Sequence, residues 1–139
     1  MKKILLSLYT AIVFAISAPG AVFAADIASG EKNFNKCQSC HSIISDAGAV
    51  IIKGGRTGPN LYGVIGRVAG SADFRYGDAM KSLGNAGFSW TEAELAQYLI
   101  NPQAWLAAKT GDPGAKTTKT YKLHRGGADI AAYLASVSK

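Results

Sequence analysis

Both cysteines of the chain lie in one five-residue motif, Cys37-Gln38-Ser39-Cys40-His41. A Cys-x-x-Cys pair could form a disulfide, act as a thioredoxin-like redox pair or help to hold zinc. A redox pair belongs near a βαβ pattern, which this sequence lacks, and structural zinc needs more cysteines or histidines nearby. The histidine directly after the second cysteine favours another interpretation, because Cys-x-x-Cys-His is the haem attachment signature. The motif therefore predicts one covalently bound haem.

The spacing of the motif suits the chemistry of this attachment. Two thiols bond to the two vinyl groups on one edge of the porphyrin, and the next residue is carried under the iron. We therefore expect Cys37 and Cys40 to hold the haem, and His41 to be the proximal metal ligand. A buried haem would also supply a core for a small chain with long loops, since residues 53–70 contain six glycines and Pro59.

The first 24 residues have the pattern of an export signal. Lys2 and Lys3 precede an apolar run, Ile4–Ile16, and small residues surround Ala24. The run is too short to span a membrane, so we expect cleavage after Ala24, no stable membrane insertion and a periplasmic location. The alternative is an uncleaved anchor. The expected organisation is a signal peptide, 1–24, followed by a single domain, 25–139.

The net charge of the whole chain is +6, from 15 basic and 9 acidic residues. Removal of Lys2 and Lys3 with the signal would leave +4. The basic residues are scattered and the charge is mild, so nucleic-acid binding is not expected. An acidic protein partner and an ordinary solvated surface both fit this charge.

Helical periodicity marks three main segments and a shorter fourth: Ile27–Cys37, Thr91–Asn101, Gly127–Val137 and Asp78–Leu83. Two overlapping capping boxes could begin the second helix, Ser89–Glu92 and Thr91–Glu94, and Pro102 should end it. No strand-like alternation stands out. The prediction is an all-α domain with about three main helices, short helices and long loops around one haem.

Six segments, in this order, resemble the cytochrome c2 type of class I c-type cytochromes: Gly30–Phe34, Thr57–Gly63, Tyr76–Lys81, Phe88–Trp90, Tyr98–Pro102 and Asp129–Leu134. The resemblance covers the chain from Gly30 to its end and implies the class I cytochrome c fold. It also implies that Gly30 lets the first and last helices approach closely, with Phe34 meeting Tyr133 across their crossing.

The resemblance implies further roles at the haem. Pro59 should accept a hydrogen bond from Nδ1–H of His41, which fixes the tautomer of a metal-binding histidine. Arg67, Tyr76 and Trp90 match positions that donate hydrogen bonds to the haem propionates. Such donors offset the cost of burying a carboxylate.

The resemblance breaks at the sixth iron ligand. The family has a methionine in a loop like Lys-x-Lys-Met-x-Phe-Lys-Leu, whereas Lys116–Leu123 reads Lys-Thr-Thr-Lys-Thr-Tyr-Lys-Leu. Lys119 falls where the methionine is expected, and we predict that it is the second metal ligand. The alternatives are His124, Met80, and a position that is empty or filled by water. An amine is a harder donor than a thioether and favours ferric iron, so a lowered potential is expected.

Three functions are compatible with such a haem protein. The first is a one-electron carrier between redox protein partners, membrane complexes included. The second is a sensor or binding protein for NO, CO or peroxide, with a labile or open sixth position. The third is a weak peroxidase, which ranks last because the sequence offers no distal His/Arg pair. We therefore expect an electron-transfer protein, not an enzyme, and a monomer.

Overall fold

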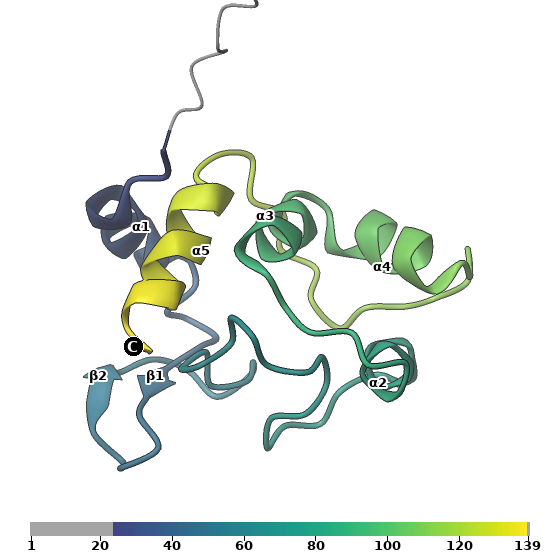
Figure 1. Ribbon diagram of the computed structural model, residues 1–139, viewed down its shortest axis with the longest axis horizontal. Helices are drawn as coiled ribbons and strands as arrows, with labels where there is room; N and C mark the ends of the chain where they lie inside the picture. The colour runs from purple at the N-terminus through teal and green to yellow at the C-terminus, as the bar shows by residue number, and fades with distance from the viewer. Residues whose placement is uncertain (1–23, 139) are drawn as a thin grey trace, which may run out of the picture.

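The computed structural model describes residues 24–138, and the expected export signal lies outside them apart from Ala24 (Figure 1). In chain order, the described elements are α1 (Ile27–Asn33), a 3₁₀ turn (Phe34–Lys36), β1 (Ile43–Ile44), β2 (Val50–Ile52), α2 (Asp78–Asn85), α3 (Glu92–Ile100), α4 (Pro102–Thr110) and α5 (Gly127–Ser136). Long loops join them, so the expectation of a helical, loop-rich domain is confirmed.

The terminal helices α1 and α5 pack against each other, and α3 packs against α5 (Figure 1). A Cβ atom added to Gly30 would lie 2.0 Å from the carbonyl oxygen of Asp129, so only glycine fits at this crossing. The rings of Phe34 and Tyr133 meet beside it, with centroids 5.9 Å apart. The close approach implied by the resemblance is confirmed.

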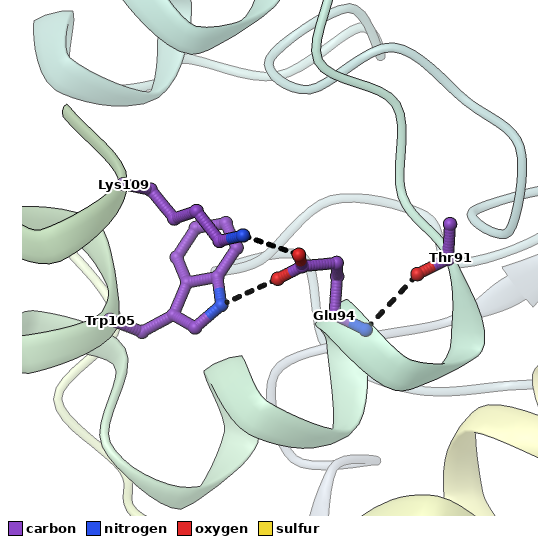
Figure 2. Close-up of polar contacts among 4 residues, drawn as sticks. All are labelled: Thr91, Glu94, Trp105 and Lys109. Atoms are coloured by element: carbon purple, nitrogen blue, oxygen red, sulfur yellow. Dashed lines mark hydrogen bonds and ion pairs between the residues drawn. The ribbon is translucent and has the colours of Figure 1, made fainter.

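Helix α3 begins at the N-cap of the second candidate capping box, Thr91, but the reciprocal bond of the box is absent among the described residues, because the Glu94 carboxylate bonds to Trp105 and Lys109 instead. The hydroxyl of Thr91 accepts a hydrogen bond from the amide of Glu94 at 3.1 Å (Figure 2).

Pro102 marks the end of α3 as expected, because α3 stops at Ile100, but a further helix that was not expected, α4, starts at Pro102 itself. Proline is well suited to the first position of a helix, and the side chain of Asn101 caps α4 by accepting from Ala104.

Other element boundaries differ modestly from expectation. The first helix tightens into a 3₁₀ turn at Phe34 before it reaches the cysteine motif. Helix α2 extends two residues past Leu83, to Asn85, and α5 begins at Gly127 as predicted. Within residues 24–138 no helix is long and apolar enough to cross a membrane.

The hairpin of β1 and β2 was not expected. Its strands pair antiparallel over two and three residues, with an irregular register between Ile43 and Ile44. Segments this short do not establish a period-2 pattern in the sequence. The side chains of Val50 and Ile51 are exposed on it.

An aromatic cluster joins α3 to α4 and the loop that precedes α3. Its members are Phe88, Trp90, Tyr98 and Trp105, with ring centroids 5.1–5.5 Å apart for the contacting pairs. Glu94 accepts a hydrogen bond from the indole N–H of Trp105 at 3.0 Å and pairs with Lys109 (Figure 2). The cluster forms one wall of the cavity described next, through Trp90 and Tyr98.

Candidate haem site

A mostly apolar cavity of about 440 Å³ lies among the helices and the long loops. The turn after α1, the loop around Pro59, α2, α3, α5 and the loop 116–121 all contribute to its lining. All eight residues singled out from the sequence are in that lining: Cys37, Cys40, His41, Pro59, Arg67, Tyr76, Trp90 and Lys119. The fold thus brings together candidates that are spread over 83 positions of the chain.

The turn of the cysteine motif directs three functional groups to one end of this cavity. The carbonyl oxygen of Cys37 accepts from the amides of both Cys40 and His41, each at 3.0 Å. Cys37 is half-buried and Cys40 is exposed, and both thiols are free. Burial raises the pKa of the Cys37 thiol, whereas hydrogen bonds from Thr57 and Ser39 lower the pKa of the Cys40 thiol.

The imidazole of His41 is held in one orientation. Its Nδ1 lies 2.7 Å from the carbonyl oxygen of Pro59, which accepts only, so Nδ1 carries the proton and Nε2 has a free lone pair. Burial lowers the pKa of His41, against the effect of the Pro59 bond, and the charge of Lys119 lowers it further. A neutral imidazole with a free Nε2 is the form that binds a metal.

Gly58 lets the backbone approach the His41 ring. A Cβ atom added there would lie 2.3 Å from Cε1 and 2.7 Å from Nε2 of the imidazole. Those distances are far below van der Waals contact, so the loop can lie against the ring only if this residue is glycine. Gly58 was not among the residues expected to matter at the site, although it precedes Pro59 directly.

Arg67 is a half-buried cation in the cavity wall. Its guanidinium donates to the carbonyl oxygens of Tyr62 and Asn60, at 3.1 and 3.0 Å, which leaves further N–H groups available. It forms no ion pair with another described residue. A buried cation without a counter-ion is costly, and an anionic group in the cavity would remove that cost.

Tyr76 and Trp90 add two more polar hydrogens at the cavity. Tyr76 is half-buried, and its burial raises the pKa of its phenol, so the hydroxyl keeps its proton. The indole of Trp90 is largely buried and lines the cavity, and no hydrogen bond from its N–H to an acceptor is found within residues 24–138. Together with Arg67 these groups suit the carboxylates of a porphyrin.

Lys119 lies half-buried in the loop between α4 and α5 and also lines the cavity. Burial lowers the pKa of its amine, although the nearby thiols of Cys37 and Cys40 act in the opposite direction. Its Nζ lies 5.3 Å from the centroid of the Tyr121 ring. The amine is therefore close enough to the cysteine motif to change the pKa values of its groups.

The two alternative protein ligands differ in position. His124 is exposed and is not part of the cavity lining. Met80 is buried on α2 and does line the cavity, so its thioether shares the space with Lys119. Of these two residues, only Met80 lies where it could compete with Lys119 as the sixth ligand, so an experiment on the ligand has to test it.

The residues present fit a covalently attached haem. Two thiols lie one helical turn apart next to a neutral imidazole with a free Nε2. Most of the remaining wall is apolar; it also contains the Arg67 cation, the hydrogen-bond donors of Tyr76 and Trp90, and the lysine and threonine side chains of the loop 116–120. This arrangement suits a flat apolar ring that has one edge for thioether bonds and two carboxylates.

The chain is similar to several known cytochromes, although no family model matches it. It is 58% identical to cytochrome c-551 of Roseobacter denitrificans over 130 residues, which cover 92% of this chain and 94% of that protein. It is 52% identical to cytochrome c2 of Rhodobacter capsulatus over 135 residues, which cover 96% of this chain and 98% of that protein.

Solved structures show the same likeness. The structure of cytochrome c2 from Rhodobacter capsulatus gives a TM-score of 0.82 at 54% identity and covers 83% of this chain and 100% of its own. An X-ray structure of a methionine-to-lysine variant of ferric cytochrome c-550 from Paracoccus versutus gives a TM-score of 0.78 at 49% identity. The match covers 82% of this chain and 97% of that one.

The chain belongs to the cytochrome c2 group of class I c-type cytochromes. It has the class I cytochrome c fold, as predicted. Cytochromes of this group carry one covalently attached haem c and are electron-transfer proteins, not enzymes. The expectations of a haem cofactor and of a non-enzymatic electron carrier are thereby confirmed.

Proposed function

We propose that this cytochrome is an exported one-electron carrier whose iron is bound by His41 and Lys119 and whose potential is lowered as a result. The observation that carries the proposal is the position of the Lys119 amine, half-buried in the cavity that also contains His41. The flanking loop residues match those of the family without a gap, so Lys119 occupies the position of the missing methionine.

Burial makes the amine a better ligand than an exposed lysine. An amine must lose its proton to bind iron, which at neutral pH costs an unperturbed lysine about 4–5 kcal/mol. Burial lowers the pKa of Lys119 and reduces this cost. The methionine-to-lysine variant of cytochrome c-550 supports the proposal, because a similar fold accepts lysine in place of one methionine.

The other cavity residues have supporting roles in this proposal. Cys37 and Cys40 form the two thioether bonds, and the Pro59 carbonyl keeps Nε2 of His41 directed at the iron. Arg67 and Trp90, with Tyr76 in the same wall, donate hydrogen bonds to the propionates. When bound, the haem supplies the one-electron chemistry, and the apolar wall excludes water from it.

Export and partners complete the proposal. Cleavage after Ala24 would release the domain into the periplasm, where it would exchange electrons as a monomer with redox protein partners. Mass spectrometry of the exported protein tests this step. A mass that starts at Ala25 supports cleavage, whereas a mass that includes residues 1–24 favours an anchored carrier.

Ferric electron paramagnetic resonance (EPR) spectra of three proteins test the iron ligation. Lys119→Ala should change the low-spin signal of the wild type, because it removes the sixth ligand. Met80→Leu, which replaces the competing thioether in the same cavity, should leave that signal unchanged. The opposite result, with the signal sensitive to Met80 and insensitive to Lys119, would assign the sixth position to the methionine.

A further inference from the structure

The loop that carries Lys119 lies extended along the surface of the molecule. Ala115 is buried and Thr117 and Lys119 are half-buried, whereas residues 116, 118 and 120 are exposed. This alternation is that of an extended backbone, in which every second side chain points to the same face. Residues 116–121 all line the haem cavity, and Thr117 and Lys119 are the less exposed side chains among them.

One side chain of α4 contacts this loop at two points. The Nε2 of Gln103 donates to the carbonyl oxygen of Ala115, and its Oε1 accepts from the amide of Thr117 at 3.2 Å. A single amide group thus bonds the loop backbone on both sides of Lys116. Gln103 is the second residue of α4, so its backbone is fixed by the helix that Asn101 caps.

The contact continues from Thr117 to Lys119. The hydroxyl oxygen of Thr117 accepts from the amide of Lys119 at 3.1 Å and lies 3.3 Å from the hydroxyl of Tyr98. The next backbone anchor is at Leu123, whose amide donates to the carbonyl oxygen of Leu99 at 2.8 Å. The position of Lys119 therefore depends directly on the segment that Gln103 holds.

We propose that Gln103 is a positioning residue that keeps the loop 115–119 closed over the haem cavity and so limits ligand exchange at the sixth position of the iron. The proposal rests on the proposed function, because Lys119 is the group that the loop delivers. Each neutral hydrogen bond contributes modestly, and loss of both should raise the population of the open loop roughly tenfold.

Gln103→Met tests this in the haem-containing protein, because it keeps the length of the side chain and removes both hydrogen bonds. Two rates should rise roughly tenfold: amide hydrogen exchange at Thr117 and Lys119, and binding of added imidazole to the ferric iron. Gln103→Glu retains only the acceptor for Thr117 and should give intermediate rates. Gln97→Met makes the same substitution at an exposed position of α3 and should change neither rate.

The same measurements in a Lys119→Met background separate this proposal from the ligand assignment. If Lys119 is not a ligand, the EPR comparison fails, but Gln103→Met should still accelerate amide exchange and imidazole binding in both backgrounds. Unchanged amide exchange in Gln103→Met would overturn the proposal. Faster amide exchange with unchanged imidazole binding would also overturn it, because the loop would then not control access to the iron.

Discussion

At the scale of single residues, the site depends on contacts that orient one imidazole. The Pro59 carbonyl, 2.7 Å from Nδ1 of His41, determines which ring nitrogen can face a metal. Gly58 brings the same loop against the ring, where a Cβ atom would come within 2.3 Å of Cε1. The absence of a side chain at Gly58 is therefore as important for the geometry as the hydrogen bond at Pro59.

Gly58→Ala should destabilise the haem-containing protein by about 1–3 kcal/mol, because the new methyl group forces either the loop or the imidazole to move. Denaturant unfolding measures this change. Gly114→Ala is the control, since a Cβ atom at this exposed position would meet only the flexible carboxylate of Asp112, at 3.2 Å. Equal stability of the two variants would show that the loop can shift without cost.

Much of the site could be predicted at this scale, but the roles of Gly58 and Gln103 could not. The cysteine motif is recognised by its spacing, and Lys119 is recognised because it differs from the methionine of the family pattern in the loop Lys116–Leu123. Gln103 has no such signal, because its two bonds are to backbone atoms of residues 12 and 14 positions away. Every residue type except proline offers the same backbone groups, so the sequence does not show which residues bond to Gln103.

At the scale of elements, helix periodicity predicts α3 and α5 well because each has a continuous apolar stripe. Helix α4 was missed because proline both ends one helix and begins another, and only the cap of Asn101 distinguishes the two outcomes. The hairpin was missed because its strands are only two and three residues long. The signal for α4 is thus a local cap and not a periodicity, and the hairpin is too short for a periodicity to show.

The contact between α3 and α4 should depend on pH. Glu94 pairs with Lys109 and accepts a hydrogen bond from Trp105 (Figure 2). Both bonds lower the pKa of the Glu94 carboxyl below the usual 4.5, and the bond from Lys109 has the larger effect. A carboxyl of this kind stabilises the fold above its unfolded pKa, and the contribution is lost as pH falls through the folded pKa.

Glu94→Gln should therefore lower the free energy of unfolding by up to about 1 kcal/mol at neutral pH and by little at about pH 3. Urea unfolding at both pH values measures the difference. Asp78→Asn removes the exposed pair with Lys81 and should have almost no effect at neutral pH. A Glu94→Gln deficit that persists unchanged in acid would show that the charge is not its cause.

At the scale of the whole molecule, the haem would extend the core that the buried apolar side chains of the described residues form. The described helices are at most ten residues long, and they and the loops enclose a cavity of about 440 Å³. A small domain buries a smaller fraction of its surface than a large one, so its own core gives limited stability. We therefore expect that a haem in this cavity contributes much of the stability of the fold.

Replacing both Cys37 and Cys40 by alanine should yield little stable protein, because the haem is no longer retained. Far-UV circular dichroism and thermal unfolding of whatever is recovered test this. A variant that lacks haem and yet unfolds cooperatively at the temperature of the wild type would show that the polypeptide forms its own core.

The ligand set links the single lysine to the behaviour of the whole carrier. A thioether stabilises ferrous iron and raises the potential, whereas an amine favours the ferric state. If Lys119 is the sixth ligand, the protein should work at a lower potential than relatives with a methionine in this loop. That difference would also change which redox partners it can reduce.

The reduction potential of Lys119→Met, measured together with its ferric near-infrared spectrum, tests the lysine ligation most directly. The substitution restores the residue that the family pattern expects in a loop that otherwise matches. Lysine ligation in the wild type predicts that the variant has a higher potential and shows the weak methionine–iron band. An unchanged potential and an unchanged spectrum would contradict it, because Lys119 would then be a loop residue without a bond to the iron.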